Sequence, residues 1–487
     1  LVFLLFSLLF IKPVQAGYQS AYNSVPSVND DWYNTLTKIN TQGDKNAVIN
    51  SWWDFGHWFK AVANRPVTFD GAAQTGHGAY WIGKALITNG EKNTIGILRM
   101  LNCGQNKAFE TLETVWNDTP RSIDTLNYIV TLSDNGARET LRSQGLTSEQ
   151  VDEVLRFTHC NAPTDYFITS EDMIGKAGVW GHFGSWDFNR AVMYQTTKTM
   201  NHDEAITFLT TRFNLSTGDA EQYVSEIQTT PADNWISPWP SYVSGMSECQ
   251  TRGKLAQCNV GTQQGTVPVS IDLENGTAMI PGPQNQILYP VSLVYATKEG
   301  IVEKRFNGTT IGFSVILVPS GETYTALFAD SRHAASTFTK LFFFEGHGMK
   351  CFSNFDRVRS FTGGKITTWT VDYDCNQQNK VFFLPVEKVM AAHILVGMDK
   401  RSEEEARALI EAIASNITTK NFASYAEKYS DDPGSRMRGG DLGEFGKGVM
   451  VKEFEEVAFS LEKGGISKPF RTPVGYHIIY VKERTED

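Results

Sequence analysis

The chain has 487 residues and a mass of 54.3 kDa, which predicts roughly three domains, each able to bury its own core. Hydrophobic residues make up 41% and charged residues 20%, so the composition is that of a globular protein and excludes a largely disordered one. The formal net charge of −10 gives no electrostatic reason to expect nucleic-acid binding.

The distribution of charge and of special residues divides the chain near Pro385. Residues 387–487 carry 15 Lys/Arg and 18 Asp/Glu, about a third of that segment, whereas about a sixth of the preceding residues are charged. All eleven Trp and all six Cys lie before residue 376. We therefore expect two regions of different origin, joined near this proline.

The first eleven residues, LVFLLFSLLFI, form an apolar run shorter than the roughly 20 helical residues that cross a bilayer. Two interpretations stay open. The run is either the hydrophobic part of a secretory signal, with Val14-Gln15-Ala16 as a possible cleavage site, or the end of a truncated transmembrane helix over residues 1–13. Nothing later resembles a span, so we expect the rest of the chain to lie in water on one side of a membrane.

Residues 14–250 are predicted to form a mixed, mainly helical domain. Hydrophobic periodicity and capping residues predict two strands, over 46–49 and 167–169, and three of the helices, over 124–136, 148–158 and 200–213.

The string Ser51-Trp-Trp-Asp-Phe-Gly-His-Trp directly follows the first predicted strand. Two adjacent Trp followed by Asp suit a rigid surface loop, because an Asp between buried indoles would be desolvated. Indole N–H groups only donate and a carboxylate only accepts, so Trp52, Trp53 and Asp54 can together surround a hydroxyl group and satisfy its lone pairs and its proton. The alternative is the edge of a Trp-lined core with a capping Asp.

WWDFG resembles the WWDYG signature of the oligosaccharyltransferase catalytic subunit, most closely the archaeal AglB type, and the resemblance covers residues 1–386. It implies that Trp52, Trp53 and Asp54 bind the Ser/Thr hydroxyl of an N-x-S/T acceptor polypeptide. The implied reaction moves a lipid-linked oligosaccharide to the Asn amide. Phe55 stands where the signature has Tyr, which removes one phenol hydroxyl and keeps the ring.

A second element of the same family is an Asp-led helix, D-x-x-K or a Met/Ile version, beside the first motif. Here Thr169-Ser-Glu-Asp-Met-Ile-Gly-Lys follows a predicted strand, with one residue more between Asp172 and Lys176 than the family pattern has. Residues four apart share a helix face, so both can still point at Asp54 or at the acceptor. The alternative is an exposed ion pair within one helix.

An amide nitrogen is a poor nucleophile, so the implied reaction needs carboxylates to hold it and a divalent metal, Mg or Mn, to neutralise the leaving phosphate. In this family the carboxylates come from loops between transmembrane helices, and we expect no metal ligands in this chain. The grouping of Asp54, His57, Asp70 and His77 lacks a recognised ligand spacing. The resemblance also implies a membrane location, with this region on the extracytoplasmic face.

Two further features bear on the compartment. N-x-S/T triplets, which are glycan acceptors only outside the cytoplasm, occur at Asn117, Asn214, Asn275, Asn307 and Asn416. The six Cys include the close pairs Cys249/Cys258 and Cys351/Cys375, which leaves Cys103/Cys160. Disulfides would indicate an oxidising compartment, whereas buried free thiols are the alternative.

Residues 251–386 are predicted to be β-rich, because short β-branched runs alternate there with Gly, Pro and Asn. Two of their strings, which begin at Ser336 and Gly363, resemble the conserved β part of the same family's soluble region, for which no chemical role is known.

Residues 387–487 are predicted to form a compact α+β domain, with a capped helix over 402–416 between strands over 391–396 and 476–481. Three strings, beginning at Met390, Tyr429 and Thr472, resemble parvulin-type peptidyl-prolyl isomerases in the expected order. The resemblance makes His393 and His477 the paired histidines of the sheet and places Asp432 where family members have Cys or Asp. It also places Met450, Phe454 and Phe470 in or beside the proline pocket.

The sequence thus predicts a multidomain α+β protein: the extracytoplasmic part of an oligosaccharyltransferase with an appended prolyl isomerase. The alternative is a secreted chaperone-like isomerase whose N-terminal region only binds polypeptide. Within the appended domain, holding unfolded chains without isomerising them also stays open.

Overall fold

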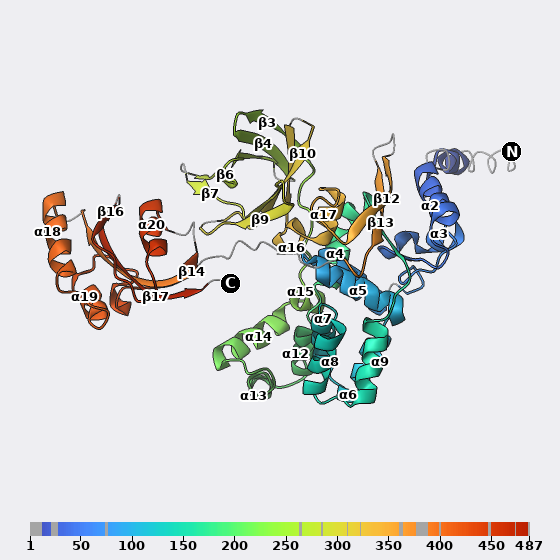
Figure 1. The fold of residues 1–487 in the computed structure, drawn as a ribbon, viewed down its shortest axis with the longest axis horizontal. Helices are drawn as coiled ribbons and strands as arrows, with labels where there is room; N and C mark the ends of the chain where they lie inside the picture. The colour runs from blue at the N-terminus through green and yellow to red at the C-terminus, as the bar shows by residue number, and fades with distance from the viewer. Residues whose placement is uncertain are drawn as a thin grey trace, which may run out of the picture. The chain divides into compact units, whose positions relative to one another are not determined.

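A computed structural model describes residues 12–20, 28–73, 76–262, 265–283, 286–308, 310–321, 323–359, 364–375, 388–398, 401–446, 450–472 and 474–485. The chain divides into two compact units that are interleaved in sequence (Figure 1). The first comprises 1–242, 296–301 and 335–375, and the second comprises 243–295, 302–334 and 376–487.

Residues 12–20 are helical, and the predicted end of a transmembrane helix falls mostly on residues 1–11, which lie outside the described residues. Among the described residues, no helix is both long enough and apolar enough to cross a bilayer.

The helices of the first unit begin largely at capping side chains. The helix predicted over 148–158 is confirmed as α9, where Thr147 and Gln150 form a capping box, and α13 begins at a second box made by Asn201 and Glu204. The single helix predicted over 124–136 is wrong. Ser133 caps a new helix there by accepting the N–H of Gly136 at 3.3 Å, so the segment is split between α7 and α8. The helices described are α2 (Asp30–Gln42), η1 (Trp53–Phe55), α3 (Gly56–Ala61), α4 (His77–Ile87), α5 (Glu91–Gly104), α6 (Lys107–Trp116), α7 (Thr119–Ile129), α8 (Asp134–Ser143), α9 (Ser148–Thr158), α10 (Asp172–Gly175), α11 (Ala177–Gly184), α12 (Phe188–Thr197), α13 (His202–Phe213), α14 (Thr217–Thr229), α15 (Ala232–Ile236) and α17 (Thr337–Phe342).

A four-stranded sheet in the order β1-β2-β13-β12 forms the centre of the first unit, with strands β1 (Val48–Asn50), β2 (Asp165–Ser170), β13 (Lys365–Val371) and β12 (Phe352–Arg359). β1 is parallel to β2, and β13 is antiparallel to both β2 and β12. Every residue of β2 is buried, so its free edge needs a partner, and β13 pairs with it along its whole length. β12 and β13 therefore lie in the first unit, although the sequence placed them in the β-rich region 251–386.

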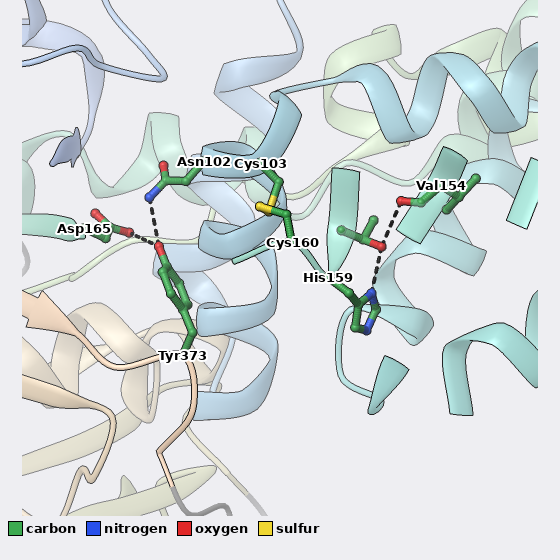
Figure 2. The surroundings of a disulfide bond; sticks show 8 residues. Asn102, Cys103, Val154, His159, Cys160, Asp165 and Tyr373 are labelled. Atoms are coloured by element: carbon green, nitrogen blue, oxygen red, sulfur yellow. Dashed lines mark hydrogen bonds between the residues drawn. A yellow bond between two sulfur atoms is a disulfide. The ribbon is translucent and has the colours of Figure 1, made fainter. Parts of the chain in front are cut away.

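All six cysteines are paired, so the free-thiol alternative is wrong. The bonds are Cys103–Cys160, Cys249–Cys258 and Cys351–Cys375, the pairs suggested by spacing. Figure 2 shows the first of them beside a partly buried chain of hydrogen bonds, in which Asn102 donates to the Tyr373 hydroxyl and that hydroxyl donates to Asp165.

In the described part of the chain, strands between residues 243 and 334, which belong mostly to the second unit, form a nine-stranded sheet in the order β7-β6-β5-β4-β3-β11-β10-β8-β9. Its apolar face gathers buried side chains from most of these strands, including Val260, Ile271, Leu293, Val315 and Phe328. The strands are β3 (Ser247–Arg252), β4 (Leu255–Thr262), β5 (Gly265–Asp272), β6 (Thr277–Pro281), β7 (Ile287–Leu288), β8 (Ser292–Ala296), β9 (Ile301–Arg305), β10 (Ser314–Ser320) and β11 (Thr323–Ala329), followed by helix α16 (Ser331–Ala334).

The C-terminal part folds around its own sheet, in the order β15-β14-β17-β16 with all pairs antiparallel. Alternate residues of β14 point to opposite faces. Ile394 and Val396 pack with α18 and α19, whereas Val389 and Ala391 pack with α20. The elements are β14 (Lys388–Gly397), α18 (Glu403–Ala414), α19 (Phe422–Tyr429), η3 (Arg436–Arg438), β15 (Asp441–Gly446), α20 (Lys452–Ser460), β16 (Phe470–Thr472) and β17 (Gly475–Thr485). The capping box predicted at Ser402 and Glu405 is confirmed.

Candidate functional site

The first candidate site lies at one edge of the four-stranded sheet. β1 and β2 are parallel, so their carboxyl ends meet at this edge, where the chain continues into WWDFG and into the Asp172 helix respectively. The Ser51 hydroxyl fixes this juxtaposition by donating to the carbonyl oxygen of Ile168 at 2.9 Å. The topology of the sheet therefore brings together two motifs that are more than a hundred residues apart.

The WWDFG string only partly forms the surface loop that was predicted. Trp52 is a core residue, 3% exposed, because its ring packs against Phe69 at 5.3 Å and Phe183 at 6.5 Å between ring centroids. Trp53 and Asp54 are partly exposed and begin the short helix η1. Within the described residues, neither indole N–H group has a hydrogen-bond partner.

Lys176 joins the two motifs. Its Nζ lies 2.8 Å from Asp54 Oδ1 and 2.8 Å from Asp172 Oδ2, so the pair is more than an exposed ion pair within one helix. Burial opposes its charge, but the hydrogen bonds and charges of the two carboxylates raise the pKa of Lys176. The ammonium group also lies 5.6 Å from the centroid of the Phe55 ring, a cation–π contact that a ring at this position supplies without the phenol hydroxyl.

One carboxylate oxygen of this site, Asp54 Oδ2, is an unsatisfied hydrogen-bond acceptor within the described residues. Asp54 Oδ2 is buried and, in the described part of the chain, has no hydrogen-bond partner, although Oδ1 of the same carboxylate is held by Lys176. A buried acceptor without a donor costs about 1–3 kcal/mol, more when it is charged. An incoming O–H group would remove that cost.

The site does not fit a divalent metal. The Lys176 ammonium lies between Asp54 and Asp172 and occupies the place that a metal shared by both carboxylates would need. No group of three or more His, Cys, Asp or Glu suited to a metal occurs among the described residues, and this includes the grouping of Asp54, His57, Asp70 and His77. In that grouping Asp70 instead forms an ion pair with Lys60.

The second candidate site is a chain of four polar side chains on the α20 face of the C-terminal sheet. Asp432 Oδ2 lies 2.8 Å from His393 Nε2, His393 Nδ1 lies 3.3 Å from His477 Nδ1, and His477 Nε2 lies 2.8 Å from the Thr472 hydroxyl. Ser435 also donates to the same Asp432 oxygen. The predicted pair of histidines therefore belongs to an extended network that includes the predicted Asp432.

The protonation states of this network follow from burial. Burial opposes ionisation of Asp432, but hydrogen bonds from Ser435 and His393 outweigh it and lower its pKa to about 2. Burial lowers the pKa of His393, and burial together with repulsion from His393 lowers that of His477 to about 3. With Asp432 ionised and both rings neutral, His393 donates to Asp432, His477 donates to His393, and Thr472 donates to His477.

An apolar wall faces the histidines. The ring of Phe454 lies 5.6 Å from His393, 5.4 Å from His477 and 5.9 Å from Phe470, measured between centroids. Met450 is half-buried and belongs to the same apolar cluster. The predicted pocket residues thus line one face of the network.

Residues 393–483 match the family described as "Rotamase: PPIC-type PPIASE domain". These residues are a parvulin-type domain. Foldase protein PrsA 4 from Bacillus cereus is 43% identical over 99 residues, which cover 20% of this chain and 33% of that protein.

The other resemblance is also confirmed. Part of the chain is homologous to archaeal oligosaccharyltransferases: "Dolichyl-phosphooligosaccharide-protein glycotransferase" from Methanococcus voltae is 39% identical over 174 residues, or 34% of this chain. The matched stretch spans 19% of that protein's length. The solved C. jejuni pglb C-terminal domain is 9% identical over 70% of this chain and 99% of that domain, with a TM-score of 0.34.

Sequence reasoning missed Ser435 and Thr472 of the isomerase network. Both lie in parvulin-like strings, Ser435 in the one that begins at Tyr429 and Thr472 at the start of another, but a small polar residue gives no sign in the sequence of its hydrogen-bond partner. It also missed Lys365, whose backbone carbonyl accepts the N–H of Glu171 at 2.9 Å, directly beside the first site.

Proposed function

We propose that the first site binds the Ser/Thr hydroxyl of an N-x-S/T sequon in an acceptor polypeptide, as part of an oligosaccharyltransferase at the extracytoplasmic face of a membrane. The observation that carries this proposal concerns the Asp54 carboxylate: Lys176 holds its Oδ1, whereas its buried Oδ2 has no hydrogen-bond partner in the part of the chain that the structure describes. The homology to archaeal glycotransferases and the three disulfides support it.

The hydroxyl group donates its proton to Asp54 Oδ2 and accepts from the indole N–H of Trp53. Lys176 keeps the carboxylate ionised and oriented, with Asp172 as its second anchor. Trp52, buried behind the site, positions this loop and offers its own N–H group. An acceptor residue without a hydroxyl would leave the oxygen unsatisfied, which gives the site its selectivity.

Transfer of a lipid-linked oligosaccharide to the Asn amide also requires a divalent metal, Mg or Mn, which would neutralise the leaving phosphate. The Lys176 ammonium lies where a metal shared by Asp54 and Asp172 would bind. The family resemblance assigns the metal ligands to loops between transmembrane helices, so our proposal assigns them to residues outside these 487. The contribution of these 487 residues is then acceptor recognition, and we expect the chain alone to bind sequon peptides without glycosylating them.

A double-mutant cycle tests this site. Fluorescence anisotropy would measure binding of an Asn-Ala-Thr peptide and its Asn-Ala-Val counterpart to the wild-type chain and to Asp54→Asn. Loss of one charge-assisted hydrogen bond, worth about 1.5–3 kcal/mol, should weaken Thr-peptide binding about 10- to 100-fold and leave Val-peptide binding unchanged. Asp233→Asn, an exposed acid of the same unit, is the matched control. Equal affinities of wild type and Asp54→Asn for both peptides would refute the proposal.

For the C-terminal domain we propose peptidyl-prolyl isomerisation. The X-Pro bond resists rotation because amide conjugation gives its C–N bond partial double-bond character, and the same conjugation places negative charge on the carbonyl oxygen. The ionised Asp432 at the pocket disfavours that charge and so weakens the partial double bond, while Met450, Phe454 and Phe470 hold the ring. His393 and His477 are positioning residues that fix Asp432.

Catalysis of a prolyl tetrapeptide would test this role. Asp432→Asn removes the charge and keeps the shape, so we expect kcat/KM to fall about tenfold, or about 1.4 kcal/mol. Glu462→Gln, an exposed acid of the same domain, should leave it unchanged. A wild-type chain that binds the peptide without accelerating isomerisation would instead establish a holding role.

A further inference from the structure

A buried serine lies behind the second motif of the acceptor site. Ser170 is the last residue of β2, pairs with Ile366 of β13 and is 2% exposed. Its hydroxyl group donates to Asp172 Oδ1 at 2.6 Å. Serine often caps the helix that follows it, but the cap residue of α10 is Glu171, whose side chain makes no capping hydrogen bond. The Ser170 hydroxyl group is therefore bound to a carboxylate of the site and not to the backbone of the helix.

Both oxygens of the Asp172 carboxylate are bound. Ser170 donates to Oδ1, and Lys176 Nζ donates to Oδ2 at 2.8 Å. A carboxylate held at both oxygens cannot rotate about its Cβ–Cγ bond without losing one of two charge-assisted hydrogen bonds, which are stronger than neutral ones. Ser170 therefore fixes the orientation of the carboxylate to which Lys176 is anchored.

The orientation of Asp172 decides where the Lys176 ammonium group lies. Its Nζ is 2.8 Å from Asp172 Oδ2 and 2.8 Å from Asp54 Oδ1, so its charge is shared between the two carboxylates. Within the described residues, Asp54 Oδ2 has no hydrogen-bond partner and is available to an acceptor hydroxyl group. An ammonium group has three N–H donors, so without Asp172 it would be free to donate to both oxygens of Asp54. The protein itself would then occupy the oxygen that the acceptor needs.

We propose that Ser170 is a positioning residue of the acceptor site, which keeps Asp54 Oδ2 open to the sequon hydroxyl group by holding Asp172 against Lys176. Ser170 is buried and its hydroxyl group is bound within the protein, so it acts through Asp172 and not by contact with the acceptor. Loss of this hydroxyl group should change the selectivity between acceptors with and without a hydroxyl group. A residue that only supports the fold would affect both kinds of acceptor alike.

This inference rests on the proposed function of Asp54, and peptide selectivity tests the two separately. Fluorescence anisotropy would measure binding of the Asn-Ala-Thr peptide and its Asn-Ala-Val counterpart to the full 487-residue chain. Ser170→Ala removes the hydroxyl group, whereas Ser170→Cys nearly keeps the volume and supplies only a weak donor. The matched control is Ser122→Ala, because Ser122 is also buried and its hydroxyl group donates to a Glu113 carboxylate oxygen at 3.0 Å. Urea unfolding followed by Trp fluorescence would show that each variant is folded.

We expect Ser170→Ala and Ser170→Cys to bind the Thr peptide about fivefold more weakly than the wild type does, and to bind the Val peptide equally well. In the Asp54→Asn background, where the acceptor hydroxyl group has lost its carboxylate, Ser170→Ala should cause no further change in Thr-peptide affinity. Ser122→Ala should keep the wild-type affinity for both peptides, although it removes a hydrogen bond of the same kind.

Four results would overturn the inference. Full Thr preference in both Ser170 variants, with the Asp54→Asn effect intact, would remove the role of Ser170 and leave the hydroxyl site standing. Equal weakening of Thr and Val peptides would show that Ser170 only supports the fold. A further loss of Thr-peptide affinity in the Asp54→Asn background would show that Ser170 does not act through Asp54. Absence of a Thr preference in the wild-type chain would refute the hydroxyl site itself and this inference with it.

Discussion

Asp165 offers a quantitative test of the buried polar network in the first unit. Its side chain is fully buried, Oδ2 accepts from Tyr373 at 3.1 Å, and Oδ1 has no hydrogen-bond partner within the described residues (Figure 2). Burial raises its pKa to about 7, and the polar side chains of Asn50, Tyr373 and Asn102 oppose that rise. Asp165→Asn keeps the shape of the side chain and removes its titration.

The sign and the size of the effect follow from linkage. Between the ordinary pKa of 3.8 and about 7, the native state holds a proton that the unfolded chain releases, so the free energy of unfolding falls as the pH rises through this window. The difference corresponds to about 4 kcal/mol. Relative to Asp165→Asn, the wild type should therefore lose about 4 kcal/mol between pH 4 and pH 8, with no further loss above pH 8 from this group.

Tryptophan fluorescence during urea unfolding isolates the relevant unit, because all eleven Trp lie within residues 1–242 and 335–375. Wild type, Asp165→Asn and the exposed control Asp233→Asn would be compared at pH 4, 5, 6, 7 and 8. The control should follow the wild type. Parallel pH profiles for wild type and Asp165→Asn would refute the prediction, because they would show that the buried carboxyl group ionises without lowering the free energy of unfolding.

Two further predictions concern the isomerase pair and a close helix contact. Burial and repulsion from His393 lower the pKa of His477 to about 3, and burial lowers the pKa of His393. Isomerase kcat/KM should therefore stay constant from pH 8 to about pH 5. An inflection near pH 6.5 would instead mean that the two rings titrate as exposed histidines do. The stability of this domain should fall as the pH drops below 6.5, since the unfolded histidines bind protons first. Gly184→Ala should lower the free energy of unfolding by about 1–3 kcal/mol, because the added Cβ would overlap the backbone of Gly83 in α4. At Gly178, on the same helix, an added Cβ meets nothing within 4 Å, so Gly178→Ala should be neutral or stabilising. Equal Tm values for the two variants would contradict this packing.

The features that could be predicted from the sequence are helix caps, which depend on nearby residues, and site residues that lie within a distinctive sequence motif. The capping boxes at Thr147, Asn201 and Ser402 follow from residues three apart, and the three parvulin-like strings placed His393, Asp432 and His477 together. Asp54 and Lys176 were also placed together, although the ion pair joins positions 122 residues apart only because β1 and β2 are neighbours.

What could not be predicted depends on long-range pairing. Nothing in the sequence of 365–371 distinguishes a partner for β2 from a strand of the β-rich region, since both are β-branched runs. That pairing decides the division into units and brings Lys365 to the acceptor site. Burial of Trp52 was missed for the same reason, because its partners Phe69 and Phe183 come from other elements.

The cores of the C-terminal domain imply that it is stable independently of the disulfides. Its two apolar clusters draw only on residues between 389 and 481, and all six cysteines precede residue 376. Reduction removes the Cys103–Cys160 and Cys351–Cys375 bonds from the first unit, at about 2–4 kcal/mol each. Dithiothreitol should therefore lower the urea midpoint reported by Trp fluorescence and weaken sequon-peptide binding, while isomerase kcat/KM stays unchanged. The measurement would be made at a temperature where the oxidised wild-type chain is folded. Loss of isomerase activity on reduction at that temperature would mean that the C-terminal domain depends on the disulfide-bonded part of the chain for its fold.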